Sequence, residues 1–403
     1  MRNRNFKSSE RGVSILRIKE SRLFNLFRLA SLFTLLFFGS QLLYSQTSNA
    51  DFERIKIAEG EILFSGLTLS PDGSTMAIST KRPNTVKLVD WKTRKLIHEY
   101  PVRQSTFGSK ISFSHEGKLL LLKGLKPMEI SENKVRNIDF EIVSASTGKQ
   151  IKLFENVQDA VISNDEKWAV TLSNDEIVFW NLAADSKGKS FNATAASNAI
   201  ALSPDGKILA VSEKVNPENI NSRFKKDKKG FKAALKYKQM VTLYDVPSGS
   251  KIKTINELYD IIYDLSFSPE GESLLVYQTP DIRIQANNNK QSFINLIDMA
   301  NQEPMRKGFT SMSLAQPELK FSNNQKLFAI NSKGSRFQEI HLYDSGSGTL
   351  QKRFELGSRF FERVEGEKLT SDSRPSFTFL PGDQSILIAM GNQLVIWNLE
   401  NNP

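Results

Sequence analysis

The sequence of 403 residues contains no cysteine and only three histidines. The absence of cysteine excludes disulfides, thiolate metal sites and a lipid-modified N-terminal cysteine. His98, His115 and His341 stand far apart in the sequence, each within or beside an expected strand or turn. We therefore interpret each histidine as a structural residue and expect no histidine-based metal site.

Catalytic motifs are equally scarce. The sequence has no H-E-x-x-H, G-x-S-x-G, Walker or dinucleotide-binding glycine pattern. The stretch "DSGSG" (Asp344–Gly348) follows an expected strand but opens no helix, so it predicts a turn and not a phosphate loop. Two acidic turns, at Asp165-Glu166 and Asp175-Glu176, lack the ligand spacing of a calcium site. We expect no catalytic residue, no metal and no cofactor.

Positive charge is concentrated at the start of the chain. Of the net charge of +10, residues 1–50 contribute +6, through eight basic and two acidic side chains. The remaining 353 residues carry a net charge of +4. A nucleic-acid partner requires a broad basic surface, so this nearly balanced body argues against one.

The basic start leads into an uncharged stretch, Leu29–Ala50. A positive segment, an apolar stretch and then small polar residues are typical of a secretory signal, with plausible cleavage points after Ser45 and Ala50. The alternative is an uncleaved membrane anchor, because the apolar run approaches ~18 residues. Both alternatives predict that residues 51–403 are exported, to the periplasm, the cell surface or the medium. An exported chain without disulfides suits a bacterial envelope.

A hairpin pattern recurs seven times in the body of the chain. Each copy is an alternating apolar segment, a tight turn and a second apolar segment; examples are "LTLSPDGSTMAIS" from Leu67, "IALSPDGKILAVS" from Ile200 and "LSFSPEGESLLVY" from Leu265. In Ser70–Gly73 the proline presets a type I turn, and the glycine supplies the left-handed conformation that rejoins the next strand.

A third strand follows each hairpin, as in "VTLYDVPSGSK" from Val241, and a short fourth strand follows most of them, as in "KIKTI". Four strands per unit, repeated seven times, predict an all-β, seven-bladed β-propeller of four-stranded antiparallel blades over residues 51–403. The chain ends just after a third strand. We expect Ile55 and Ile57 of the mature N-terminus to supply the missing strand and to close the ring.

The repeats resemble the WD-repeat and YVTN-type β-propeller superfamily over residues 55–400. The resemblance lies in the Ser-Pro-Asp/Glu-Gly turns and in the third strands that end in Tyr-Asp or Trp-Asn, such as Tyr244-Asp245 and Trp180-Asn181. No Gly-His dipeptide opens a repeat, so the His–Asp–Trp network of the eukaryotic-style members is not expected. The bacterial, YVTN-like members are nearer.

Four long segments interrupt the repeats: Lys123–Asp139, Glu213–Gln239, Thr279–Gln291 and Leu356–Ser376. In a propeller, each of these connections leaves from the same face, and elaborated loops on a rigid scaffold are where binding residues concentrate. Glu213–Gln239 contains "RFKKDKKGFKAALKYK", half of whose positions are Lys or Arg. Leu356–Ser376 places two aromatic residues between two arginines, a composition favoured at interfaces.

These segments supply the candidate binding residues, which are Arg223, Lys225, Lys226, Lys228, Lys229, Phe231, Lys232, Lys236, Arg359, Phe360, Phe361 and Arg363. The alternatives are a solvated loop for the first segment and aromatics packed under their own loop for the second. We expect a protein or an anionic envelope component as partner, no nucleic acid, membrane contact only through residues 1–50, and a monomeric propeller.

The sequence therefore favours an exported, non-catalytic binding or scaffold propeller. The alternative is an axial-channel enzyme, since YVTN-like propellers resemble lactonases and related hydrolases. Such an enzyme needs His, Arg and carboxylates at the inner strand ends. The inner strands "LTLS", "ISFS", "IALS", "LSFS" and "LKFS" offer mainly serine and apolar residues, which favours binding.

Overall fold

Each sequence repeat forms one four-stranded antiparallel sheet in the computed structural model of the protein. The structure describes residues 52–55, 63–81, 84–102, 108–125, 137–174, 176–193, 197–220, 222–255, 261–279, 292–310, 317–333, 338–356 and 374–399. The chain divides into two units, residues 1–50 and residues 51–403, and all described residues belong to the second. The first unit, and with it the expected signal or anchor, lies outside the described residues. No helix among the residues that are described is long and apolar enough to cross a membrane.

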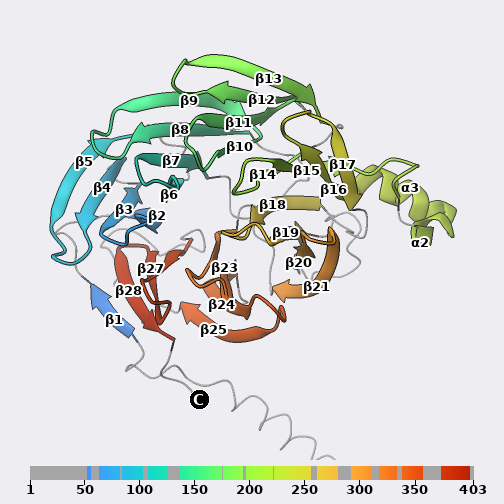
Figure 1. Ribbon diagram of the computed structural model, residues 1–403. Helices are drawn as coiled ribbons and strands as arrows, with labels where there is room; N and C mark the ends of the chain where they lie inside the picture. The colour runs from blue at the N-terminus through green and yellow to red at the C-terminus, as the bar shows by residue number, and fades with distance from the viewer. Residues whose placement is uncertain are drawn as a thin grey trace, which may run out of the picture. The chain divides into compact units, whose positions relative to one another are not determined.

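The described strands make seven sheets, arranged as blades around a common axis (Figure 1). Blade 1 contains β2 (Phe64–Leu69), β3 (Thr75–Thr80), β4 (Thr85–Asp90) and β5 (Leu96–Pro101). Blade 2 contains β6 (Ser109–Phe113), β7 (Leu119–Gly124), β8 (Ile138–Ser144) and β9 (Gln150–Val157). Blade 3 contains β10 (Asp159–Ile162), β11 (Trp168–Ser173), β12 (Glu176–Asn181) and β13 (Ser186–Asn192). Blade 4 contains β14 (Ile200–Leu202), β15 (Ile208–Lys214), β16 (Gln239–Asp245) and β17 (Lys251–Ile255).

The remaining blades follow the same order, with the first strand innermost. Blade 5 contains β18 (Ile261–Phe267), β19 (Ser273–Thr279), β20 (Ser292–Asp298) and β21 (Glu303–Thr310). Blade 6 contains β22 (Leu319–Phe321), β23 (Leu327–Lys333), β24 (Gln338–Asp344) and β25 (Leu350–Leu356). Blade 7 contains β26 (Ser376–Phe379), β27 (Ser385–Met390) and β28 (Gln393–Asn398), with β1 (Phe52–Ile55) beside β28. The expected seven-bladed, all-β fold is confirmed.

The hydrophobic core lies in layers between neighbouring blades. Successive side chains of a strand point to opposite faces of its sheet, and consecutive positions of the middle strands are buried, as in β3 and β4, so both faces of a sheet pack on neighbouring blades. Between blades 6 and 7, for example, the rings of Phe354 and Trp397 stack with their centroids 4.9 Å apart. Both side chains are fully buried, and burying a large apolar side chain contributes roughly 1.5–3 kcal/mol.

The turns between the first two strands adopt the expected geometry. In blade 1, the Gly73 amide donates to the Ser70 carbonyl at 2.8 Å, and the Ser70 hydroxyl donates to the Asp72 carboxylate at 2.5 Å. Gly73 has a φ of 70°, the left-handed region that glycine adopts without strain. The same arrangement recurs in blade 4, where the Ser203 hydroxyl donates to Asp205 at 2.6 Å.

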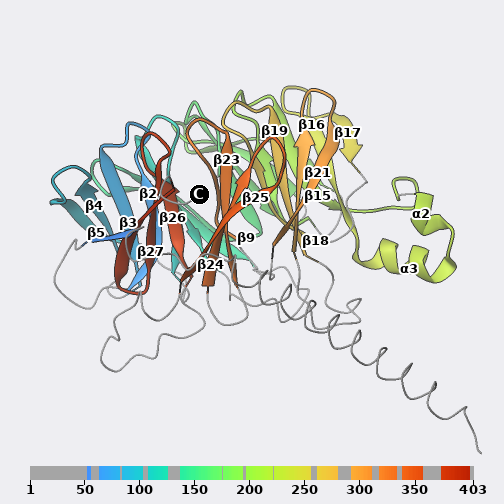
Figure 2. The same ribbon diagram turned by 90° about the horizontal axis from the view of Figure 1, so that it is seen from below.

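The ring has two faces of different character (Figure 2). The short-turn face carries the connections between first and second strands and between third and fourth strands. The insertion face carries the connections between second and third strands and those between blades. All four long segments leave from strand ends on the insertion face, as the strand order of the sequence predicts. Only Glu213–Gln239 lies mostly within the described residues.

Glu213–Gln239 forms two helices, α2 (Ser222–Lys225) and α3 (Lys228–Tyr237), that stand outside the ring beside blade 4 (Figures 1 and 2). Asp227 caps α3, because its carboxylate accepts from the amides of Lys229 at 3.1 Å and Gly230 at 2.7 Å. Ala234 is buried and Leu235 half-buried, whereas Lys232 and Lys236 are exposed, so α3 has one apolar and one basic side.

Candidate functional site

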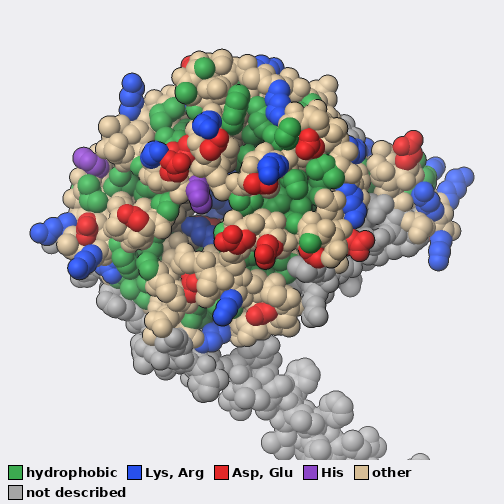
Figure 3. All heavy atoms as spheres, in the orientation of Figure 1, with side chains coloured by type: hydrophobic (Ala, Val, Ile, Leu, Met, Phe, Trp, Pro, Cys, Tyr) green, Lys and Arg blue, Asp and Glu red, His purple; other side chains and the backbone are tan. Residues whose placement is uncertain are grey.

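Charged side chains gather at the axis of the ring. The inner strands and the residues just before them contribute Lys110, Asp159, Asp264, Glu318 and Lys320, and Lys123 of β7 and Arg374 join them. Figure 3 looks onto the short-turn face, which is hollowed at the centre of the ring and shows basic and acidic side chains around the hollow. The axis is the first candidate site.

An ion pair spans the axis. The ammonium nitrogen of Lys110, in blade 2, lies 3.5 Å from a carboxylate oxygen of Asp264, in blade 5. The same ammonium donates to the carbonyl of Pro317, just before blade 6. The Lys110 and Asp264 side chains are 22% and 26% exposed to solvent, because they face the open channel. Lys110 therefore links three blades.

Lys320 and Glu318 make a second link. Their charged groups lie 3.1 Å apart, and the Lys320 ammonium also donates to the carbonyl of Leu67 at 2.9 Å. Leu67 belongs to the inner strand of blade 1, so this contact bypasses blade 7 and joins blade 6 to blade 1.

Asp159 makes a third link. One of its carboxylate oxygens pairs with the ammonium of Lys123 in blade 2. The other accepts from the amide of Ile200, in blade 4, at 2.9 Å. Inner strands are sheet edges, whose unpaired backbone groups need partners. The axial side chains supply such partners, so their arrangement braces the ring.

Burial shifts the protonation of these groups. Desolvation lowers the pKa of Lys110 despite the attraction of Asp264, and desolvation raises the pKa of Asp264 despite Lys110. Burial also acts to lower the pKa of Lys123, but the carboxylates of Asp159 and Asp264 outweigh it, and the pKa of Lys123 is raised. The protonation of each of these axial groups therefore depends on the charges of its neighbours.

The interpretation of the inner strands as serine and apolar was wrong at the axis. Lys320 lies inside "LKFS". Charged residues occupy the position four residues before the turn serine in four blades, at Lys110, Asp159, Asp264 and Glu318. That position, one residue ahead of the inner-strand segments, was the signal that sequence reasoning missed.

A cavity of about 590 Å³ lies along the axis, between the charged braces and the short-turn face. Its walls include Ser112, Ser266 and Ala201, and His115 lies near its rim. Of the other histidines, His98 is exposed on β5 and His341 is buried, with its Nε2 2.7 Å from a carboxylate oxygen of Glu339. Among the described residues, no group of three or more His, Asp or Glu side chains is placed to hold a metal ion.

The second candidate site is the basic surface of α2 and α3. The described side chains of the predicted set are exposed at Lys225, Lys226, Lys228, Lys229, Lys232 and Lys236, and Phe231 is half-buried. The helix macrodipole disfavours lysine in a first turn, and α3 begins with Lys228 and Lys229 and has no acidic residue in its first turn. Lysines placed there against helix stability are consistent with a role in binding.

The rest of the predicted set is not brought to this surface by any described contact. Arg223 lies in α2, but its side chain is outside the described residues, as are Arg359, Phe360, Phe361 and Arg363. The composition of Glu213–Gln239 and of Leu356–Ser376 pointed to a binding site. The structure describes most of the first segment but not the candidate residues of the second.

No protein-family model matches the chain, and no curated protein matches it. Among solved structures, the chain is similar to the β-propeller domain of Cps50 (Swd1) from Myceliophteria thermophila. The TM-score is 0.57 at 12% sequence identity, and the match covers 86% of this chain and 99% of that chain. At this identity the likeness shows the propeller fold alone.

Proposed function

We propose that this chain is a non-catalytic scaffold propeller that binds a protein partner with an acidic surface through its insertion face. The exposed lysines of α2 and α3 are the observation that carries the proposal. They stand beside the outer edge of the ring at blade 4, in a segment that leaves from the insertion face. The pairing of the axial charges with one another supports a binding role over a catalytic one.

Affinity capture tests this proposal. Wild-type protein and a variant with Lys225, Lys226, Lys228 and Lys229 changed to Ser would be used to capture partners from an envelope extract. We expect the variant to lose partners that wild type retains, and the loss to diminish as salt is raised, because exposed charges are screened.

A matched control changes one exposed lysine in each of four short turns to Ser, at Lys118, Lys167, Lys207 and Lys326. This control removes the same charge from the opposite face. Equal capture by wild type and both variants, or equal loss in both variants, would overturn the proposal for this surface.

The proposal includes export and a bacterial, YVTN-like origin. The basic start and the uncharged stretch Leu29–Ala50 support export. N-terminal sequencing of the protein from envelope fractions would test it: a start after Ser45 or Ala50 indicates a cleaved signal, and an intact N-terminus in the membrane fraction indicates an anchor. Protein confined to the cytoplasmic fraction with an intact N-terminus would contradict export.

The second candidate function is a lactonase-like hydrolase, and the axial cavity is the observation in its favour. Lys110 and Asp264 would then be part of an active site. Hydrolysis of γ-lactones by wild type, abolished in a folded variant with Lys110→Met and Asp264→Leu, would establish this alternative. The mutual pairing of these two groups across the axis supports the scaffold instead.

A further inference from the structure

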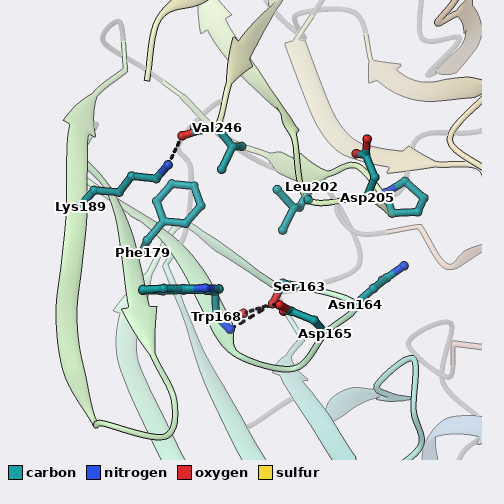
Figure 4. A pocket seen from close by; sticks show the side chains of 11 residues that line it. Ser163, Asn164, Asp165, Trp168, Phe179, Lys189, Leu202, Asp205 and Val246 are labelled. Carbon is teal, nitrogen blue, oxygen red and sulfur yellow. Dashed lines mark hydrogen bonds between the residues drawn. The ribbon is translucent and has the colours of Figure 1, made fainter. Parts of the chain in front are cut away.

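A slot between blades 3 and 4 opens on the short-turn face. Its volume is about 480 Å³. The aromatic rings of Trp168 and Phe179 form one wall, from blade 3, and Leu202 and Val246 face them from blade 4 (Figure 4). The slot is therefore largely apolar and open at the protein surface.

This slot differs from its counterpart between blades 1 and 2, which has a similar volume of about 500 Å³. Thr75 and Leu88 stand at the positions of Trp168 and Phe179, as counted from the turn serine and from the end of the third strand. The repeat thus creates slots between blades. The blade 3–4 slot has aromatic rings at these two positions, whereas the blade 1–2 slot has its phenylalanine, Phe113, at the position of Leu202.

The shape of the slot depends on Gly188. A Cβ at this position would lie 2.8 Å from the ring of Trp168, so only glycine lets that ring lie against β13. Lys189 borders the slot, with its ammonium 4.8 Å from the Phe179 ring centre and donating to the Val246 carbonyl. The aromatic wall is thus fixed in place before any partner arrives, which lowers the entropic cost of binding.

The slot carries carboxylates at its turns. Asp165 and Asp205 both line it. The hydrogen bond from Ser163 lowers the pKa of Asp165; at Asp205 burial acts to raise the pKa, but the hydrogen bonds from Ser203 and the Lys207 amide outweigh it, and the pKa is lowered. The exposed neighbours Lys167 and Lys207 lie 3.3 and 3.6 Å from the two carboxylates. Exposed pairs of this kind contribute little, so a cation on a partner can replace these lysines.

We propose that the blade 3–4 slot is a docking site for a segment of a partner protein that carries an aromatic side chain next to Lys or Arg. The aromatic side chain enters between Trp168 and Leu202, where offset or edge-to-face ring contacts add to its burial. The adjacent cation pairs with Asp165 or Asp205. The slot opens on the short-turn face, whereas the segment that carries α3 leaves from the insertion face, so the inference does not depend on the proposed function.

Three acetylated and amidated pentapeptides, GKFKG, GKAKG and GEFEG, test the inference by NMR titration of the wild-type protein. We expect GKFKG to bind roughly tenfold more tightly than either of the others, from the burial of one Phe side chain and from charge complementarity. Equal binding of all three peptides would overturn the proposal.

Val246→Phe should fill the slot and remove the advantage of GKFKG. The same position in blade 1 is occupied by Trp91, so the turn accepts a large side chain. The matched control is Ala145→Phe, which fills the blade 1–2 slot and should leave GKFKG binding unchanged. Loss of binding in the control, or its retention in Val246→Phe, would contradict the proposal.

Asp165→Asn with Asp205→Asn provides a second test that preserves the turns. Asn324 fills this turn position in blade 6 and accepts from the Ser322 hydroxyl at 2.9 Å. The double variant should bind GKFKG and GKAKG more weakly by a similar factor, whereas Asp72→Asn with Glu116→Gln, in the blade 1–2 slot, should not. An unchanged affinity in the first variant would refute the role of the carboxylates.

Discussion

The ammonium nitrogen of Lys110 lies 3.5 Å from a carboxylate oxygen of Asp264, on the far side of the ring axis. The two residues belong to blades 2 and 5, which are not neighbours in the ring. A pair of this kind ties the ring across its centre, where the interblade cores do not reach. Its energetic role can be measured because each partner can be removed separately.

We expect Lys110→Met to lower the free energy of unfolding by about 2 kcal/mol, because Asp264 then keeps a partly buried charge without its cation. This loss is smaller than that expected for a fully buried ion pair, because both groups are partly exposed to the channel. Urea unfolding of the purified variant measures it.

The double variant Lys110→Met, Asp264→Leu is the control for this prediction. Replacing both partners by apolar residues is often nearly neutral, so its stability should lie within about 1 kcal/mol of wild type. If the losses of unfolding free energy in the two single variants instead add up in the double variant, the two groups act independently, and the ion pair does not stabilise the ring.

The stability of the ring should fall in acid through its turn carboxylates. Hydrogen bonds from Ser248 lower the pKa of Asp245 below its ordinary value of 3.8. Because the folded state binds this proton less tightly than the unfolded state, the stabilising contribution is present above pH 3.8 and is lost as the pH falls through the folded pKa.

Asp245→Asn tests that prediction, since Asn181 fills the same position in blade 3 and accepts from the Ala184 amide at 2.8 Å. The variant should melt below wild type at neutral pH, and the difference should shrink as the pH falls below 3.8, the ordinary pKa of the aspartate side chain. Melting curves across this range decide the matter; a difference that stays constant in acid assigns the loss to something other than titration.

Two glycines that share a left-handed conformation but stand in different short turns should differ in their sensitivity to substitution. Gly148 and Gly206 have φ values of 68° and 70°. A Cβ on Gly148 would lie 2.5 Å from the ring of Tyr100 in blade 1, whereas a Cβ on Gly206 would meet nothing within 4 Å. Gly206→Ala should cost about 1 kcal/mol from backbone strain alone.

Gly148→Ala should cost clearly more than Gly206→Ala, because it also displaces Tyr100 from the layer between blades 1 and 2. Chemical unfolding of the two variants gives the comparison. Equal losses would show that the interblade packing at this turn yields to the added methyl group.

Closure of the ring by the N-terminal strand is a further proposal, supported by the antiparallel register in which Ile55 lies opposite Leu394. Ile57, the other expected residue, lies outside the described residues. Removal of residues 1–59 should lower the melting temperature sharply, because β28 becomes an open edge. An unchanged melting curve would contradict closure.

The fold could be predicted from sequence because its determinants are local. The turn residues and the alternation of apolar residues are local in the sequence, and the hairpin that they form recurs in every blade, although Ser-Pro-Asp-Gly itself stands only in blades 1 and 4. The pairing of Lys110 with Asp264 could not be predicted in this way. The pairing depends on how seven sheets are arranged around the axis. In the sequence, each of the two charged residues looks like an ordinary surface residue.

One of the candidate binding surfaces was predictable from local sequence and the other was not. The lysines of α3 were predicted because their density is visible in the sequence. The blade 3–4 slot was missed, because Trp168 and Phe179 come together only when β11 and β12 pair and blade 4 packs against them. In the sequence, a single aromatic residue in a strand predicts only a buried core position.

We infer that the ring is braced at its axis and propose that it binds at the surface of α2 and α3. The affinity of a captured partner would be measured for three proteins: wild type, the axial variant Lys110→Met, Asp264→Leu, and the variant with Lys225, Lys226, Lys228 and Lys229 changed to Ser. We expect the axial variant to bind as wild type does and the lysine variant to bind roughly tenfold more weakly. Loss of binding in a folded axial variant, with full binding by the lysine variant, would contradict both expectations.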